Sequence, residues 1–200
     1  MNQDSRSFVA RTTDASRSSF AAGARSGVLQ AGAVAVFALL TAVGAHIRIP
    51  LEPVPITLQS LFVLLAGAIA GPALGTLSQG LYVAGGVLGV PLLAGTAVGF
   101  AVLSGPTGGY LVGFAAAAWL VGRLIGRGSS FGWSVLVFAA GSALILALGV
   151  LHLAFFTSGD FSAAFRLGFL PFVPGDAAKT LAAASIYGSY RRLRQTRAAQ

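Results

Sequence analysis

The stretch FGWSVLVFAAGSALILALGVL, residues 131–151, decides the fold class of this chain, because it contains no Asp, Glu, Lys or Arg. An apolar run of this length predicts a helix that spans a bilayer, whose hydrocarbon core of roughly 30 Å needs about 20 helical residues. Five further apolar runs lie along the chain. They cover residues 28–45, 57–70, 73–90, 106–125 and 174–187. The sequence therefore predicts an all-α membrane protein with six transmembrane helices.

Two of these runs, 57–70 and 174–187, are short for a bilayer, so we expect them to be tilted, kinked or extended by loop residues. Gly-Pro pairs stand at the start of two runs, 73–90 and 106–125. Gly71-Pro72 precedes the run 73–90 and is typical of helix punctuation. An interruption of the helical structure is therefore predicted between the second and third spans.

The composition excludes most functions of soluble proteins. Of the 200 residues, 56% are hydrophobic and 9% are charged, against roughly 25% charged in an ordinary soluble domain. The net charge of +8 does not predict nucleic-acid binding, because the Arg residues lie mainly in the tails and one short loop, without a basic face that includes aromatic residues.

The chemistry that the sequence can support is also narrow. The chain has no Cys, and its only imidazoles, His46 and His152, lie far apart, so we expect neither a metal site nor a cofactor. The sole Lys follows an Ala, which excludes a phosphate-binding Gly-Lys-Ser/Thr loop, and no Ser-His-acid order stands out. We therefore expect no catalytic residue and a protein that is not an enzyme.

The distribution of Arg predicts that both ends of the chain face the cytoplasm. With the N-terminus inside, ten Arg residues lie on the cytoplasmic side and two on the outer side. The ten are Arg6, Arg11, Arg17, Arg25, Arg123, Arg127, Arg191, Arg192, Arg194 and Arg197, and the two are Arg48 and Arg166. We expect a disordered cytoplasmic tail over residues 1–26, a six-helix membrane domain over 27–190 and a basic cytoplasmic tail over 191–200.

The first apolar run, residues 28–45, has two interpretations. It could be the core of a signal peptide, but its length of roughly 18 residues exceeds the usual 7 to 15 and favours a true span. A stripe of small residues follows one side of the run, at spacings of four, three and four. The stripe consists of Ala31, Ala35, Ala38 and Ala42. It is either a docking face for another membrane protein or a surface that packs within the protein itself.

An ionisable group inside a span is costly and is by default a functional hypothesis. Asp176 and Lys179 stand in the motif PGDAAK at the start of the last span. Their spacing of three places both side chains on one helical face, where Asp176 can neutralise Lys179. We expect Asp176 to cap the helix. Lys179 and the helix end could bind a ligand carboxylate, while Asp176 could accept hydrogen bonds from ligand N–H groups. The alternative is a purely structural pair that fixes the start of the helix.

Two further segments could contribute to a cavity on the outer side. The segment GPTGGY, residues 105–110, opens a span, and its Thr107 and Tyr110 add polar groups; helix punctuation is an equal alternative. The segment IPLEPVPITLQ, residues 49–59, holds three prolines that forbid a regular helix and favour an extended chain. This second segment either caps the cavity or is a plain connector.

Taken together, these motifs resemble the BioY family, the biotin-specific substrate-binding components of energy-coupling-factor transporters. The resemblance covers about residues 31–187 and rests on four segments in a fixed order. They are IPLEPVPITLQSLFVLLAG (49–67), GPALGTLSQGLYVAGGVLGVPLLAG (71–95), GPTGGYLVGF (105–114) and PFVPGDAAK (171–179). Some members carry an Arg in the loop before the third segment, where residues 93–98 of this chain have none.

The resemblance implies a six-helix protein of the cytoplasmic (inner) membrane of a prokaryote, with a biotin cavity near the outer surface. Its partners would be a transmembrane coupling protein and ATP-binding subunits, and the Ala stripe would contact the coupling protein. The residues that match the family's ligand-binding motifs are Asp176, Lys179, Gly105, Thr107, Gly108 and Tyr110.

Two other functions stay open at this point. One is a secondary carrier for a small organic acid, coupled to protons through Asp176 or Asp160. The other is a membrane scaffold built on the Ala stripe, which would bind no small ligand. All three functions place the chain in membrane lipid and away from nucleic acid.

Overall fold

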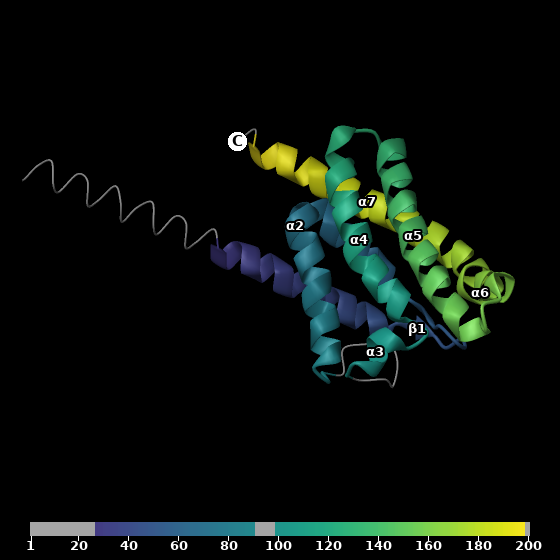
Figure 1. Ribbon diagram of the computed structural model, residues 1–200. Coiled ribbons are helices and arrows are strands. Elements are labelled where there is room, and N and C mark those ends of the chain that lie inside the picture. The colour runs from purple at the N-terminus through teal and green to yellow at the C-terminus, as the bar shows by residue number, and fades with distance from the viewer. Residues whose placement is uncertain (1–26, 91–98, 199–200) are drawn as a thin grey trace, which may run out of the picture. The chain divides into compact units, whose positions relative to one another are not determined.

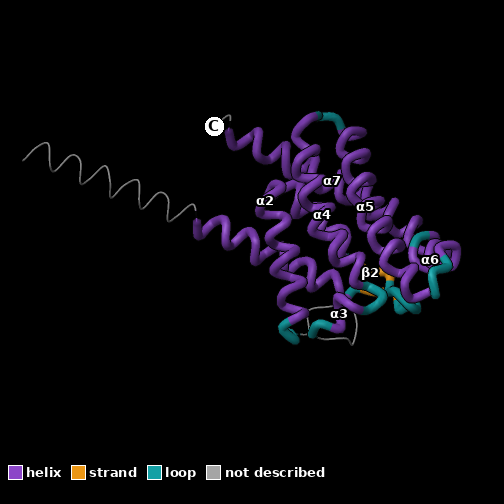
Figure 2. Tube along the Cα trace, in the orientation of Figure 1, coloured by secondary structure: helices purple, strands orange, loops and turns teal. Residues whose placement is uncertain are grey.

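The computed structural model describes residues 27–90 and 99–198, and these residues are almost entirely helical (Figures 1 and 2). Two compact units divide the chain, 1–33 and 34–200. The first helix, Gly27–His46, crosses this division, and the expected tail over 1–26 lies outside the described residues. The remaining elements belong to the second unit, to which the following description refers.

The second unit consists of long helices joined by short connecting elements. The long helices are α2 (Gln59–Val87), α4 (Gly108–Leu124), α5 (Phe131–Leu153) and α7 (Val173–Ala198). The short elements are β1 (Arg48–Ile49), β2 (Ile56–Thr57), α3 (Ala101–Ser104), η1 (Ile125–Arg127), η2 (Ala154–Thr157), α6 (Phe161–Gly168) and η3 (Leu170–Phe172). In Figure 1, the turn between α4 and α5 lies at the upper end of these helices, and β1 and α3 lie at the lower end.

Helix α2 is a hairpin of two antiparallel arms rather than one straight helix. The backbone leaves the helical region at Gly71, where φ is 86° and ψ is 175°, and Pro72 begins the second arm. The Gln59 side chain donates to the hydroxyl of Tyr82, although a straight helix would separate these residues by about 35 Å. The break predicted at Gly71-Pro72 is confirmed, and it turns the chain back on itself.

Glycine lets the backbones of neighbouring helices come into direct contact. A Cβ built on Gly67 would lie 2.3 Å from the carbonyl oxygen of Ala118, and one on Gly122 would lie 2.5 Å from the nitrogen of Pro72. No side chain fits at either position without a shift of the partner helix. Helices α2 and α4 therefore pack through their backbones, as small-residue interfaces in membrane proteins do.

The proline-rich connector between the first helix and α2 is extended, as expected, but it also forms a small antiparallel ladder. Arg48 of β1 pairs with Thr57 of β2, and Ile49 pairs with Ile56. Only these four of the described residues lie in strands, so the fold is nearly all helical, as predicted. The pairing closes the connector into a loop at the end of the helices that carries the candidate site.

Helix α7 differs from the prediction at both of its ends. It begins at Val173, so Asp176 lies inside the first turn and the expectation that Asp176 caps the helix is wrong. The helix also continues past the apolar run, which ends at Tyr187, to Ala198. The described basic residues from Arg191 onward are therefore helical, and Arg191 donates to the carbonyl oxygen of Ser129 at 3.0 Å.

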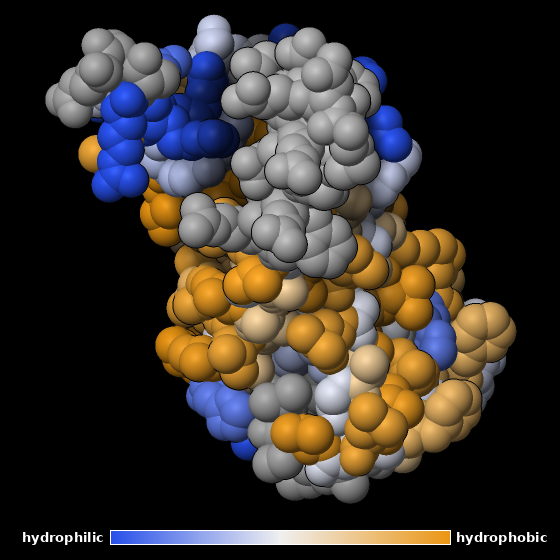
Figure 3. All heavy atoms as spheres, turned by 90° about the vertical axis from the view of Figure 1, so that its left-hand side faces the viewer, coloured by the Kyte–Doolittle hydropathy of each residue, from blue (hydrophilic) through white to orange (hydrophobic). Residues whose placement is uncertain are grey.

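Four helices among the described residues are long and apolar enough to cross a membrane. They are Gly27–His46, Gln59–Val87, Gly108–Arg127 and Phe131–Thr157. Figure 3 shows hydrophobic residues over the middle of one face and hydrophilic residues gathered chiefly toward its upper end. Side chains such as Leu77, Val112 and Leu136 are more than half exposed, although they are large and apolar. Such a surface is that of a membrane protein.

Candidate ligand-binding site

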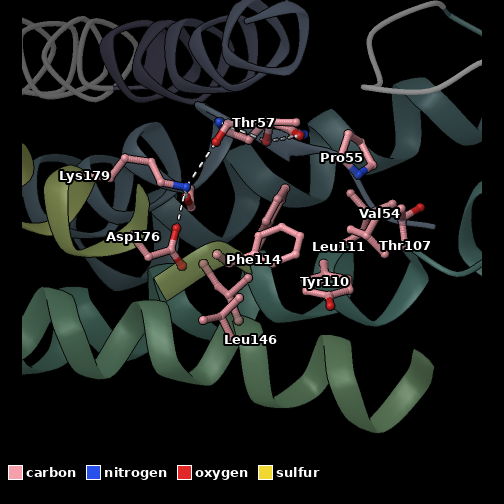
Figure 4. A pocket seen from close by; sticks show the side chains of 14 residues that line it. Val54, Pro55, Thr57, Thr107, Tyr110, Leu111, Phe114, Leu146, Asp176 and Lys179 are labelled. Carbon is pink, nitrogen blue, oxygen red and sulfur yellow. Dashed lines mark hydrogen bonds and ion pairs between the residues drawn. The ribbon is translucent and has the colours of Figure 1, made fainter. Parts of the chain in front are cut away.

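A cavity of about 590 Å³, including the open solvent at its mouth, lies where the ends of several elements meet (Figure 4). The lining residues come from the connector around β2, the start of α2, the start of α4, the middle of α5 and the start of α7. They are Val54, Pro55, Thr57, Gln59, Ser60, Thr107, Tyr110, Leu111, Phe114, Ile145, Leu146, Phe172, Asp176 and Lys179.

The ionic pair predicted from the sequence forms in the wall of this cavity. The ammonium group of Lys179 contacts Oδ1 of Asp176, and both side chains are about nine-tenths buried. Nζ of Lys179 also donates to Oγ of Ser60 at 2.7 Å and to the carbonyl oxygen of Thr57 at 3.1 Å. Two of the three N–H donors of the ammonium group are therefore hydrogen-bonded to the connector and the start of α2, beside the ion pair with Asp176.

The two carboxylate oxygens of Asp176 have different surroundings. Oδ2 accepts a hydrogen bond of 2.6 Å from the buried hydroxyl of Ser142 on α5. Oδ1 faces Lys179 as its ion-pair partner and accepts no hydrogen bond from the described residues. Because a carboxylate oxygen can accept two hydrogen bonds, Oδ1 keeps acceptor capacity for a donor that enters the cavity.

A second chain of polar contacts runs from the connector to the second arm of α2. The Thr57 hydroxyl donates to Oε1 of Gln59 at 2.7 Å, and the amide of Gln59 donates to the hydroxyl of Tyr82, which is fully buried in the second arm of α2. These contacts use both ends of the Gln59 amide. The hairpin of α2 therefore fixes the connector at Thr57, whose carbonyl oxygen is a partner of Lys179.

The structure divides the residues expected from the glycine-rich segment. Thr107 and Tyr110 line the cavity, whereas Gly105 and Gly108 do not. The Tyr110 hydroxyl donates to the carbonyl oxygen of Gly168 at 2.8 Å, and its ring stacks on that of Phe172. The backbone of Gly108 instead packs against Leu103, where an added Cβ would lie 1.9 Å from the carbonyl oxygen.

Several lining residues were not among the site residues predicted from the sequence. Thr57, Gln59 and Ser60 belong to the connector and the first turn of α2, where the sequence left a cap and a plain connector as equal readings. Leu111 and Phe114 follow Thr107 and Tyr110 at helical spacing. That periodicity was a usable signal, because positions i, i+3, i+4 and i+7 share one face of a helix.

The four residues of the Ala stripe in the first helix differ in burial: two are buried and two are exposed. Ala38 and Ala42 are buried in the protein's own core, so they pack within the molecule. Ala35 is exposed in the second unit, and Ala31 is exposed in the first. The two interpretations of the stripe thus apply to different residues. Only the exposed residues leave surface for another membrane protein.

These features define a class: a helical membrane protein with a cavity lined by its helices and by the connector before α2. The model of the BioY family matches residues 15–196. The chain belongs to the BioY family, which confirms the resemblance drawn from its motifs.

Related proteins and a solved structure agree with this assignment. The chain is 44% identical to a biotin transporter BioY of Thermotoga maritima, over 76% of this chain and 89% of the relative. It is 43% identical to a probable biotin transporter BioY of Pyrococcus horikoshii, over 76% and 90%. A crystal structure of the S-component for biotin from an ECF-type ABC transporter superposes with a TM-score of 0.74 at 26% identity, covering 84% of this chain and 93% of that one.

Proposed function

We propose that this protein is the biotin-binding membrane subunit of a biotin uptake system, and that biotin occupies the cavity beside Asp176 and Lys179. The observation that carries the proposal is Oδ1 of Asp176, a buried carboxylate oxygen in the wall of the cavity that accepts no hydrogen bond from the described residues. The names of the BioY relatives and of the biotin S-component point to the same ligand.

The chemistry of biotin suits the walls of the cavity. Its ureido group offers two N–H donors, and Oδ1 of Asp176 has capacity to accept one of them. Its apolar rings and chain need an apolar wall, which Leu111, Phe114 and Leu146 supply. Thr107 and Tyr110 line the cavity and would contact the ligand, while Gly105 and Gly108 would shape the segment that holds them.

Six spans with both ends in the cytoplasm are the proposed topology, in the cytoplasmic membrane of a prokaryote. The two arms of α2 would be the second and third spans, and α7 would be the sixth. The position of Arg123, Arg127 and Arg191 near one end of the helices supports this orientation. Residues 1–26 would then form a cytoplasmic tail, and the helix of α7 would enter the cytoplasm after residue 190.

Energy for uptake would come from separate proteins, a transmembrane coupling protein and ATP-binding subunits, because the sequence has no phosphate-binding loop. We propose that the exposed Ala35 contributes to the contact with the coupling protein, and that Ala31 does so on the part of the helix before residue 34. The protein itself would bind and release biotin without catalysis.

The alternative of a proton-coupled carrier gains no support from Asp160. This residue is exposed, and its carboxylate accepts from the backbone N–H of Ala163 at 3.0 Å, which caps α6. A carboxylate in that position has a structural role at a helix start. It also lies outside the cavity.

The test is a calorimetric titration of the purified full-length protein with biotin, in the absence of any ATPase. Near-stoichiometric binding is expected, with strong loss in Asp176→Asn and Lys179→Ala. Asp160→Asn is the matched control, because it changes an exposed Asp outside the cavity and Asn also caps helices. No binding by the unaltered protein would overturn the ligand, and full binding by both site variants would overturn the site.

A further inference from the structure

The start of α4 is anchored by a carbonyl group that accepts two hydrogen bonds. The backbone at Gly105 is extended, with φ of −84° and ψ of 177°, so the helical conformation is interrupted here between α3 and α4. The Gly105 carbonyl oxygen accepts from the backbone N–H of Gly108 at 3.0 Å, which closes a turn. The same oxygen lies 3.0 Å from Nε2 of His152, on the last turn of α5.

This geometry fixes the form of the imidazole. A carbonyl oxygen only accepts, so Nε2 of His152 carries the hydrogen and donates it. The ring is half-buried and packs against Phe155 and Phe156, with centroids 6.3 and 5.6 Å away. The donor is therefore held in place by its neighbours as well as by Gly105.

The two glycines that follow lie directly on the same side chain. A Cβ built on Gly109 would lie 2.3 Å from Cβ of His152, and one on Gly108 would lie 3.1 Å from its Nε2. The backbone of residues 105–109 therefore follows the surface of His152 from Nε2 to Cβ. Both the length and the donor of this side chain are therefore in contact with the segment.

The segment that rests on His152 also carries part of the cavity wall. Thr107 lies between the anchored carbonyl and the packed glycines, and Tyr110 follows directly after them. Both line the cavity, whereas His152 does not. The imidazole is thus placed to set the position of two cavity residues without touching what the cavity holds.

We propose that His152 is a positioning residue of the ligand site: its Nε2–H holds the Gly105 carbonyl and thereby places Thr107 and Tyr110 against biotin. This proposal rests on the proposed function, since its effect is measured through biotin. It differs from simple packing, because it requires a hydrogen-bond donor at the reach of Nε2 and not only a ring of the right volume.

Three substitutions of His152 distinguish the effect of its hydrogen-bond donor from the effect of its side-chain volume. His152→Gln keeps an amide N–H at the reach of Nε2, His152→Asn holds its amide one methylene shorter, and His152→Phe keeps the ring but has no donor. Biotin titration of the purified protein is expected to show binding within about threefold of the unaltered protein for Gln, and roughly tenfold weaker binding for Asn and Phe, as the loss of one hydrogen bond predicts.

A nitroxide label at Ser104→Cys gives a second readout, because the chain has no other Cys and Ser104 is exposed beside Gly105. The mobility of the label is measured by electron paramagnetic resonance without biotin. It should be higher in the His152→Asn and His152→Phe variants than with His152, and in His152→Gln it should equal that with His152. A purely volumetric role predicts the opposite order, with Phe closest to the unaltered protein.

His46→Phe is the matched control, since this histidine also bonds a backbone carbonyl, that of Ala42 at 2.8 Å, but is exposed and outside the cavity. It should leave both readouts unchanged. Equal biotin affinity in Gln, Asn and Phe would overturn the proposal for His152 while the proposed function stands. Failure of the unaltered protein to bind biotin would overturn the proposed function, and the label would still report whether His152 holds the segment.

Discussion

The hydroxyl of Ser142 on α5 donates to Oδ2 of Asp176 on α7 over 2.6 Å, and both side chains are buried. This bond orients the carboxylate so that Oδ1 faces Lys179 and the cavity. A hydrogen bond to a charged group contributes roughly 1.5–3 kcal/mol, about twice a neutral one. The residue that orients the acidic side chain therefore stands 34 positions before it in the chain.

Ser142→Ala is expected to weaken biotin binding by roughly tenfold, because Oδ2 of Asp176 loses its donor and the carboxylate can turn away from the cavity. Calorimetric titration measures the change. Ser134→Ala is the control, since Ser134 is also buried on α5 but its hydroxyl donates to the carbonyl oxygen of Ser130, one turn before. Equal affinities in the two variants would show that Ser142 does not orient Asp176.

Removing one charge of the buried pair should cost more than removing both. Lys179→Met and Asp176→Asn each leave an uncompensated charge in the wall, with an expected loss of about 3–5 kcal/mol of stability. The double variant should recover a large part of this loss, although it should not bind biotin. Thermal unfolding in detergent of the four proteins gives the coupling between the two residues. Additive losses would contradict a direct interaction.

Gly67→Ala should strongly destabilise the protein, because the added methyl would lie 2.3 Å from the carbonyl oxygen of Ala118 and would force α2 and α4 apart. Overpacking of this kind costs about 1–3 kcal/mol or more. Gly80→Ala is the matched control on the same helix, where nothing lies within 4 Å of the added group. It should unfold at the temperature of the unaltered protein or slightly above it. The contact between the helices is refuted if both variants unfold together.

The proposed topology can be tested with single cysteines, since the natural chain has none. Ser129→Cys lies in the turn between α4 and α5, and Ser162→Cys lies in α6, and both side chains are exposed. A membrane-impermeant maleimide added to intact cells should label position 162 and leave 129 unlabelled until the membrane is opened. The reverse pattern would invert the orientation.

Ala35→Leu should reduce co-purification with the coupling protein by roughly tenfold, if this exposed residue lies in the interface, because a larger side chain keeps the helices apart. Biotin binding should not change. Ala143→Leu, an exposed alanine on α5, is the control and should co-purify normally. Unchanged co-purification of both variants would remove Ala35 from the contact.

The sequence predicted the helices best where an apolar run has clear ends. The run 131–151 became Phe131–Leu153, with Ser130 accepting from the backbone N–H of Trp133 at its start. The run 174–187 predicted α7 poorly, because the helix continues into Arg and Gln residues, which form helices well but are not apolar. Hydropathy finds the part of a helix in lipid and not the whole helix.

The candidate site was predicted only as far as local spacing reaches. Asp176 and Lys179 stand three residues apart, so their contact follows from the geometry of a helix. Ser60, which accepts from Lys179, lies 119 residues before it. Such a contact depends on how α2 packs beside α7, and no local pattern contains that information. Ser142 and Gln59 were missed for the same reason.

The hairpin of α2 has a consequence for the lipid that surrounds it. Its arms, residues 59–70 and 72–87, extend for about 18 and 24 Å at the rise of an α-helix. As the second and third spans of the proposed topology, both arms would be shorter than a hydrocarbon core of about 30 Å. A span that is too short is met by a thinner bilayer or by flanking residues that reach the interface. The length of the lipid acyl chains should therefore determine how large the mismatch at α2 is.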